Sequence, residues 1–171
     1  MKPVFLAMAV TCMLLALTAG GTGLAVEGER SFAFHFAIGL IATLGLCLSH
    51  CVVFTYFMAT SKMMTLAVSD AGLDPSLVVE CRRLKLRAYR RALAGIVAAM
   101  VAAFAGAFTT DNPGWSRLHL AAALLSLGVN AYVFAGEYLL ISVNGRLMDR
   151  VFGEHDRQSR SRGVAGAKPA P

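Results

Sequence analysis

Charged residues are scarce in this chain of 171 residues. Asp, Glu, Lys and Arg make up 15% of it, hydrophobic residues make up 57%, and the mean hydropathy is +0.62. Soluble domains contain about 25% charged and about 45–50% apolar residues. The composition therefore excludes an ordinary soluble domain and predicts an all-α integral membrane protein.

The motifs of common enzyme classes are also missing. The sequence contains no glycine loop for phosphate, no His-Glu-x-x-His and no Gly-x-Ser-x-Gly. Ser49 and His50 are adjacent on a predicted helix, so they face different directions and do not form a nucleophile–base pair. None of the four cysteines forms a Cys-x-x-Cys pair, which removes a zinc ribbon and a disulfide framework. We expect no enzyme that acts alone.

Four apolar stretches are long enough to cross a bilayer, since about 20 helical residues span the hydrocarbon layer. They predict a four-transmembrane-helix bundle in a domain of residues 1–156, with spans at about 3–26, 32–57, 92–109 and 118–143.

The formal net charge of +6 indicates orientation, not nucleic-acid binding, because most Lys and Arg residues flank the spans in two blocks. One block lies between spans two and three and the other follows span four, whereas the turns at 27–31 and 109–117 are poor in Lys and Arg. Basic loops remain in the cytoplasm. We predict a multi-pass protein of the inner (plasma) membrane with both termini in the cytoplasm.

Span one also has an alternative interpretation as a cleaved signal peptide. Lys2 precedes the apolar core, and small residues at Thr18 to Gly21 offer a cleavage site. The stretch has no polar break before Glu27, which favours an uncleaved helix.

The helical patterns continue past the predicted cytoplasmic boundary. Residues 76–91 and 144–152 are expected to form a short helical collar, with Asp74 or Ser76 as a cap. The basic tail, residues 157–171, is expected to be disordered because it is polar and rich in small residues.

Small residues predict how the helices pack. In span three, Gly95, Ala99 and Ala103 recur every four residues, which permits close approach of neighbouring backbones. This pattern predicts a central position for span three. It also fits contact with a second copy of the chain.

Span four carries polar residues along one helical face, which must point into the bundle. The structural interpretation is that they form hydrogen bonds between helices, with Glu137 paired to Arg87, Arg90 or Arg91. The functional interpretation is an intramembrane site. This interior polar stripe consists of Ser126, Asn130, Glu137 and Asn144.

Two histidines begin spans two and four at equal depth on the outer side. His35 and His119 are therefore candidate axial ligands of a haem b, with Gly39 and Ala123 one turn below to admit the macrocycle. His50 follows His35 by 15 residues, a spacing that resembles the histidine pairs of b-type cytochromes. Span four has no second histidine, so a two-haem protein is not predicted.

Cys47, His50 and Cys51 share a helical face, a spacing compatible with copper(I) or zinc. A packed helix with a hydrogen-bonded histidine explains the same residues. We favour packing and predict no metal site.

Two hypotheses remain from these observations. The first is a non-catalytic subunit or scaffold of a membrane complex, whose partners are the lipid bilayer and other membrane subunits or further copies of itself. The second is a haem b electron-transfer or membrane-anchor subunit of an oxidoreductase, with His35, His119 and His50 as candidate cofactor-binding residues. In the first, a basic collar contacts anionic lipid or an acidic partner through Arg82, Arg83, Lys85, Arg87, Arg90 and Arg91.

Overall fold

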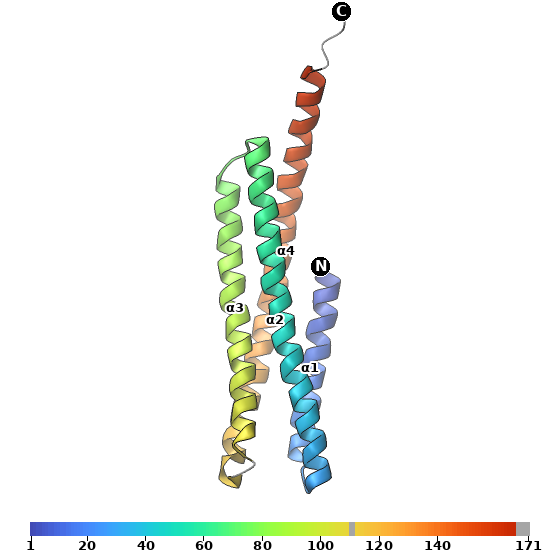
Figure 1. The fold of residues 1–171 in the computed structure, drawn as a ribbon, viewed down its shortest axis with the longest axis vertical. Coiled ribbons are helices and arrows are strands. Elements are labelled where there is room, and N and C mark those ends of the chain that lie inside the picture. Colours follow the sequence, from blue (N-terminus) through green and yellow to red (C-terminus); the bar gives the residue numbers. More distant parts are fainter. Residues whose placement is uncertain (110–111, 167–171) are drawn as a thin grey trace, which may run out of the picture.

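Four long helices lie side by side in the computed structural model, which describes residues 1–109 and 112–166 (Figure 1). The described residues contain no strand. All four helices are long and apolar enough to cross a membrane. They are α1 (Lys2–Leu24), α2 (Glu29–Ala71), α3 (Ser76–Ala107) and α4 (Ser116–Gly166), with a short 3₁₀ helix η1 (Pro113–Trp115) before α4.

Local sequence determines where α2 begins and ends. Oγ of Ser31 accepts a hydrogen bond of 3.0 Å from the backbone N–H of Gly28, the residue before the helix. Gly72 follows the helix with φ 69°, a left-handed conformation that favours glycine. Ser31 and Gly72 therefore determine where α2 begins and ends.

The start of α3 differs in detail from the predicted cap. Pro75 occupies the capping position, and no side chain caps the helix. Instead, the Asp74 carboxylate accepts hydrogen bonds from the backbone N–H and the hydroxyl of Ser76, at 2.8 and 2.6 Å. These bonds lower the pKa of the Asp74 carboxyl. Asp74 thus stabilises the turn before the helix and leaves the helix end uncapped.

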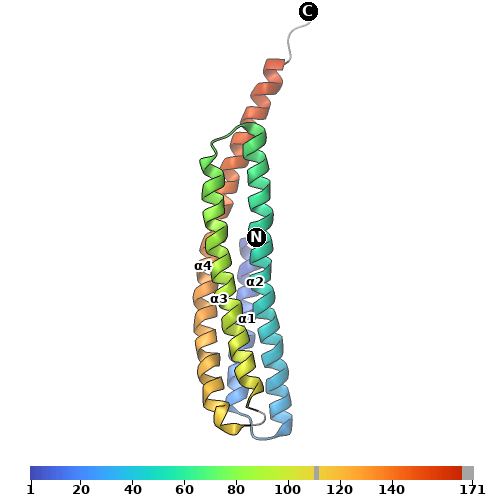
Figure 2. The same cartoon turned by 60° about the vertical axis from the view of Figure 1, so that its left-hand side comes forward.

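The helices have unequal lengths, so one end of the bundle contains fewer helices than the other. At about 1.5 Å per residue, the 23 residues of α1 extend about 35 Å and the 43 residues of α2 about 65 Å. The N-terminus of α1 lies part-way along α2 (Figure 2). Beyond it, α2, α3 and α4 continue as a three-helix column.

Each helix packs on its sequence neighbours, and α1 also packs on α4. Across the bundle α2 contacts α4, whereas α1 and α3 make no comparable contact within the described residues. The central position predicted for span three is therefore wrong. The buried polar residues of α2 and α4 meet across the bundle and account for this diagonal contact.

The C-terminal tail also differs from the prediction, because α4 continues through residue Gly166. Residues 157–166, predicted to be disordered, are helical, and residues 167–171 lie outside the described part of the chain. Extending an existing helix requires no new nucleation, and residues 154–162 contain neither Gly nor Pro. Polar composition alone was therefore an unreliable signal for disorder.

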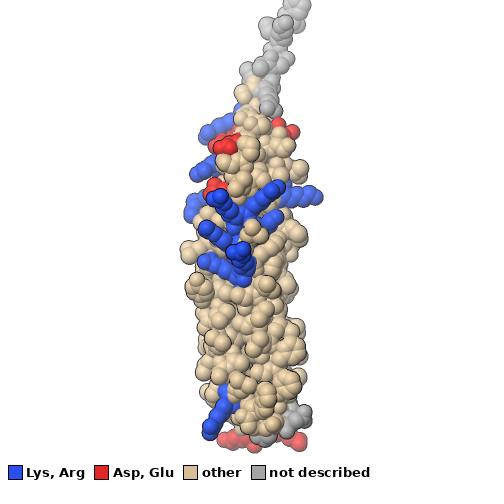
Figure 3. All heavy atoms as spheres, turned by 90° about the vertical axis from the view of Figure 1, so that its left-hand side faces the viewer, with Lys and Arg blue, Asp and Glu red and all other residues tan. Residues whose placement is uncertain are grey.

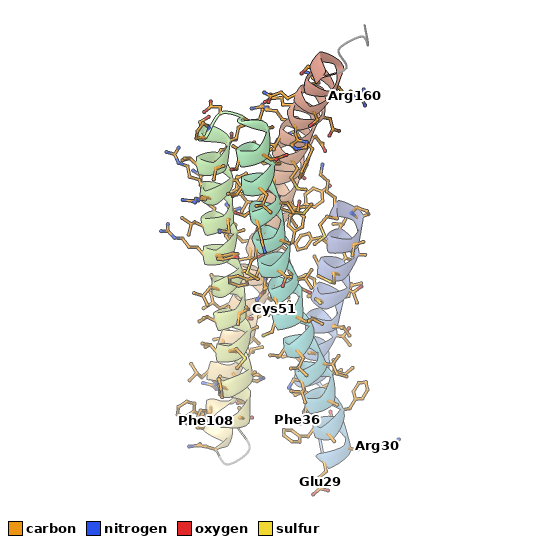
Figure 4. All side chains as sticks on the ribbon, turned by 45° about the horizontal axis from the view of Figure 1, so that its top comes forward. Glu29, Arg30, Phe36, Cys51, Phe108 and Arg160 are labelled. Carbon is orange, nitrogen blue, oxygen red and sulfur yellow. The ribbon has the colours of Figure 1, made fainter. Side chains whose placement is uncertain are left out.

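Charged side chains gather at the two ends of the molecule. On the face shown in Figure 3, Lys and Arg cluster on the three-helix column, above a broad band without charge. Glu29 and Arg30 mark the opposite end, at the turn between α1 and α2, while Arg160 lies far along α4 (Figure 4). The uncharged band lies along helices that are long and apolar enough to span a membrane.

Candidate functional site

A buried contact between His50 and Glu137 joins α2 to α4. Nδ1 of His50 lies 3.1 Å from Oε1 and 3.2 Å from Oε2 of Glu137, and both side chains are 0% exposed. The expected pairing of Glu137 with an arginine is replaced by this contact. Arg91 influences Glu137 only through its charge, and its guanidinium packs over Gly136. The buried acid thus finds its direct partner on α2.

Asn130 contacts the other nitrogen of the same imidazole. Its Oδ1 lies 2.9 Å from Nε2 of His50. Its Nδ2 donates to the backbone oxygens of Ser126 at 2.9 Å and Gly95 at 3.4 Å, and to Oγ of Ser126 at 3.3 Å. Backbone carbonyls only accept hydrogen bonds, so the amide nitrogen must face them and Oδ1 must face His50.

This orientation of Asn130 determines the protonation of His50. Because Oδ1 only accepts, Nε2 of the imidazole carries a hydrogen. The contact between Nδ1 and Glu137 then contains one further proton, held either by the imidazole or by the carboxyl. In both arrangements His50 and Glu137 together carry no net charge. A neutral, fully hydrogen-bonded pair is the form that a low-dielectric interior tolerates best.

Packing encloses the His50 ring on both sides. The Phe134 ring stacks on it with a centroid distance of 4.9 Å and an interplanar angle of 21°. On the α3 side, a Cβ at Gly95 would overlap the imidazole. Phe5 of α1 meets Phe134 edge to face at 5.9 Å. All four helices therefore contribute to the enclosure of this site.

A second polar cluster lies further along the same face of α4. Nδ2 of Asn144 donates to Oγ1 of Thr60 at 3.1 Å and to the hydroxyl oxygen of Tyr56 at 3.2 Å. Oδ1 of Asn144 is the one buried side-chain oxygen or nitrogen without a hydrogen-bond partner in the described part of the chain. Every residue of the interior polar stripe is buried, and each one bonds within the bundle.

The histidines at the end of the bundle opposite the three-helix column lie next to each other. The ring centroids of His35 and His119 are 6.0 Å apart, with an interplanar angle of 68°. Nδ1 of His35 lies 3.0 Å from the backbone oxygen of Ala19 on α1, and Nδ1 of His119 lies 3.1 Å from that of Ala102 on α3. Since a carbonyl accepts, each Nδ1 carries the hydrogen, and each neutral ring keeps a lone pair on Nε2.

Both histidines rest on a glycine of the neighbouring helix. A Cβ at Gly23 would lie 2.7 Å from Cε1 of His35, and one at Gly106 would lie 2.9 Å from Cε1 of His119. The hairpins α1–α2 and α3–α4 thus make the same local contact near their turns. The sequence signal for this repetition is weak, because it consists of one histidine, one glycine and a small residue per hairpin.

Cys47, His50 and Cys51 diverge from one another in the structure. His50 is fully buried toward α4, Cys47 is half-buried and Cys51 is exposed. Among the described residues, no group of three or more His, Cys, Asp or Glu side chains is arranged to hold a metal ion. The cluster is explained by packing around one hydrogen-bonded histidine.

The basic collar lies on the outer surface of α3 beyond the apolar band (Figure 3). Arg82, Arg83, Arg87 and Arg90 are exposed, and Lys85 and Arg91 are half-buried. No carboxylate of the described residues comes within 4 Å of these cations. The collar therefore presents uncompensated positive charge.

Sequence reasoning missed the residues that complete the His50 site. Phe134 and Gly95 carry no polar group, and their role depends on which helix faces His50. Cys12 likewise meets Ser49, with Sγ 3.3 Å from Oγ, although Cys12 lies in an apolar run and carries no pattern that indicates a partner on α2. The spacing of small residues on α3 was the one available signal for Gly95.

No protein-family model, curated protein or solved structure matches the chain. The site's own chemistry is therefore the basis for a functional proposal.

Proposed function

We propose that the chain is a non-catalytic subunit or scaffold of a complex in the inner membrane. The observation that carries the proposal is that Glu137, Asn130 and Asn144 of the interior polar stripe all bond to α2, although Oδ1 of Asn144 has no partner among the described residues. His50, Asn130 and Glu137 satisfy one another in an enclosed, uncharged unit. Such a unit specifies how the helices pack and offers no group to a substrate.

The three-helix column supplies the surface for partners. The hydrocarbon core is about 30 Å thick, so α2 and α4 extend well beyond it on the side where α1 begins. The basic collar lies on α3 toward this end of the bundle, and Arg82, Arg83, Arg87 and Arg90 are exposed, whereas Arg91 packs against Gly136 of α4. Its charge suits anionic lipid or an acidic protein partner. The clustering of Lys and Arg at this end supports a cytoplasmic placement of the column and both termini.

The size of the protein in its native membrane tests the proposal. We expect the chain, extracted with its surrounding lipid by an amphipathic polymer, to migrate as an assembly larger than one copy. The charge reversals Arg83→Glu, Arg87→Glu and Arg90→Glu should release a folded single chain. Arg117→Glu, an exposed arginine at the opposite end, is the control and should leave the assembly intact. A single chain under all these conditions would contradict the scaffold proposal.

A haem b electron-transfer role is the second candidate, because of how His35 and His119 are held. Metal-ligating histidines usually donate their other ring N–H to a carbonyl or carboxylate. Both imidazoles do so here, through Ala19 and Ala102, and both retain Nε2 as a donor atom for iron. A Cβ at Gly39 would meet no atom within 4 Å, which leaves space beside His35.

A reduced-minus-oxidised visible spectrum of the purified protein tests this second candidate. Haem held by these residues gives a Soret band that disappears in both His35→Ala and His119→Ala. His155→Ala, which changes a histidine outside the apolar band, should leave the band unchanged. The absence of a Soret band in the unmodified protein would rule out haem binding by the isolated chain.

A further inference from the structure

A groove of about 320 Å³ lies between α2 and α3 on the three-helix column. Met58 lies at the start of its α2 side, and Lys62 follows one helical turn further along. Arg82 and Lys85 face them from α3. The complete lining consists of Met58, Ser61, Lys62, Thr65, Leu66, Arg82 and Lys85.

The lining contains three cations and no acid. No carboxylate of the described residues lies within 4 Å of Lys62, Arg82 or Lys85. Lys85 is half-buried between the helices, while the other two are exposed. Like charges gathered without a counterion repel one another, so an anion bound among them is favoured. The guanidinium of Arg82 is also suited to bidentate contact with a phosphate.

The level of the groove along the bundle indicates where its anion comes from. On α2, residues 31–61 contain no Asp, Glu, Lys or Arg, and Met58, which is 60% exposed, lies at the end of the apolar span predicted from the sequence. The hydroxyl of Tyr89 donates to the backbone oxygen of Phe54, which aligns this part of α3 with the same level of α2. Lys62 lies about 6 Å beyond Met58. The headgroup layer is about 5–8 Å thick on each side of the hydrocarbon. The cations therefore stand at headgroup height.

We propose that this groove binds the phosphate of an anionic phospholipid. Lys62, Arg82 and Lys85 contact the headgroup phosphate, and exposed Met58 lies against the start of the acyl chains. The inference rests on the proposed function in one respect, which is that this end of the bundle stands at a membrane surface. It adds to the collar predicted from sequence a specific site, with Lys62 from α2 as a member.

Lipid retention by the purified full-length protein tests the proposal. The protein is exchanged into mixed phosphatidylglycerol and phosphatidylcholine, and the lipids that remain bound after delipidation are counted by native mass spectrometry. We expect selective retention of phosphatidylglycerol. A direct contact between a basic residue and the headgroup is worth about 1 kcal/mol, or about fivefold in binding, so removing the three contacts in the groove should weaken retention roughly a hundredfold. The variant combines Lys62→Gln, Arg82→Gln and Lys85→Gln.

A matched control removes the same charge from the collar outside the groove. Arg83→Gln, Arg87→Gln and Arg90→Gln should retain most of the phosphatidylglycerol binding, and circular dichroism checks that both variants fold. Equal losses in the two variants would show diffuse charge attraction and overturn the groove assignment. Equal retention of both lipids by the unmodified protein would also overturn it.

Two further arms separate the possible sources of the anion. Excess inorganic phosphate should fail to displace the lipid, and displacement would indicate a site for free phosphate. An acidic peptide, poly-glutamate, should bind more weakly than phosphatidylglycerol, and the reverse order would indicate a protein partner. Lipid retention is measured on the isolated chain. A loss of the lipid result would therefore contradict the groove proposal alone, whereas absence of a larger assembly would contradict the scaffold proposal.

Discussion

Nδ1 of His50 lies 3.1 Å from Oε1 of Glu137 in a part of the bundle where neither side chain reaches the surface. Asn130 holds the opposite nitrogen of the ring and thereby requires a hydrogen on Nε2. The pair is consequently neutral overall, although one proton lies between two ionisable groups. This relationship links α2 to α4 and gives the bundle its most constrained contact.

Removing the acid alone should destabilise the protein strongly. Glu137→Leu leaves Nδ1 of His50 without a hydrogen-bond partner, and breaking a buried pair from one side costs about 3 kcal/mol or more. Glu137→Gln keeps an acceptor oxygen and should cost less. The double variant His50→Leu with Glu137→Leu should recover part of the loss, because neither member of the pair is left without the other, although Oδ1 of Asn130 loses its donor. Unfolding by sodium dodecyl sulfate in mixed micelles measures the differences. Additive losses in the double variant would show that the two residues act independently.

The close approach of α3 to His50 depends on the absence of a side chain at Gly95. Gly95→Ala places a methyl group against the imidazole, and overpacking of this kind costs about 1–3 kcal/mol. Gly128→Ala on α4 is the matched control, since its Cβ would meet no atom within 4 Å. That control should be neutral or stabilising by about 0.5–1 kcal/mol, because alanine favours helix over glycine. The same unfolding assay compares the two, and equal stability would remove Gly95 from the site.

Hydropathy was sufficient to predict the helices of the bundle. Apolar runs of membrane length are a strong signal, and each predicted span overlaps a helix that meets the length and composition needed to span a bilayer, although α1 and α3 each end two residues before the predicted end of the span. The burial of Asn130 and Glu137 followed from their spacing on one helical face together with the cost of exposing polar groups to lipid.

The partners of these polar groups could not be predicted, because they depend on which helices are diagonal neighbours. Glu137 has several arginines nearby in the sequence pattern, and nothing in one chain favours His50 over Arg91. The choice follows from the rotation of α2, which turns His50 inward and Cys51 outward. The extent of α4 was missed for a different reason, since residues after 157 are polar yet continue a helix that already exists.

The orientation in the membrane yields a direct prediction. Green fluorescent protein fused after Gln158 should fluoresce and alkaline phosphatase fused there should be inactive, because Lys and Arg concentrate at that end of the bundle and place it in the cytoplasm. A reporter inserted beside Glu29, in the turn between α1 and α2, should give the opposite result. Alkaline phosphatase fusions report the outer side of the membrane, and green fluorescent protein fusions report the cytoplasmic side. An external signal at Gln158 would invert the topology and place the lipid groove on the outer surface.

A pH-sensitive contact joins the far ends of α2 and α4. Nε2 of His155 lies 3.0 Å from Oδ2 of Asp70, and this hydrogen bond, with a smaller effect from Asp156, raises the pKa of the imidazole above its usual value of about 6.5. The stabilisation is thus fully present below about pH 6.5 and is lost as the pH rises through the higher folded value. A nuclear magnetic resonance titration of His155 should give a raised midpoint that moves back toward 6.5 in Asp70→Asn. Thermal stability should fall between pH 6 and pH 8 more in the unmodified protein than in His155→Gln. An unchanged midpoint in Asp70→Asn would show that the contact does not form in solution.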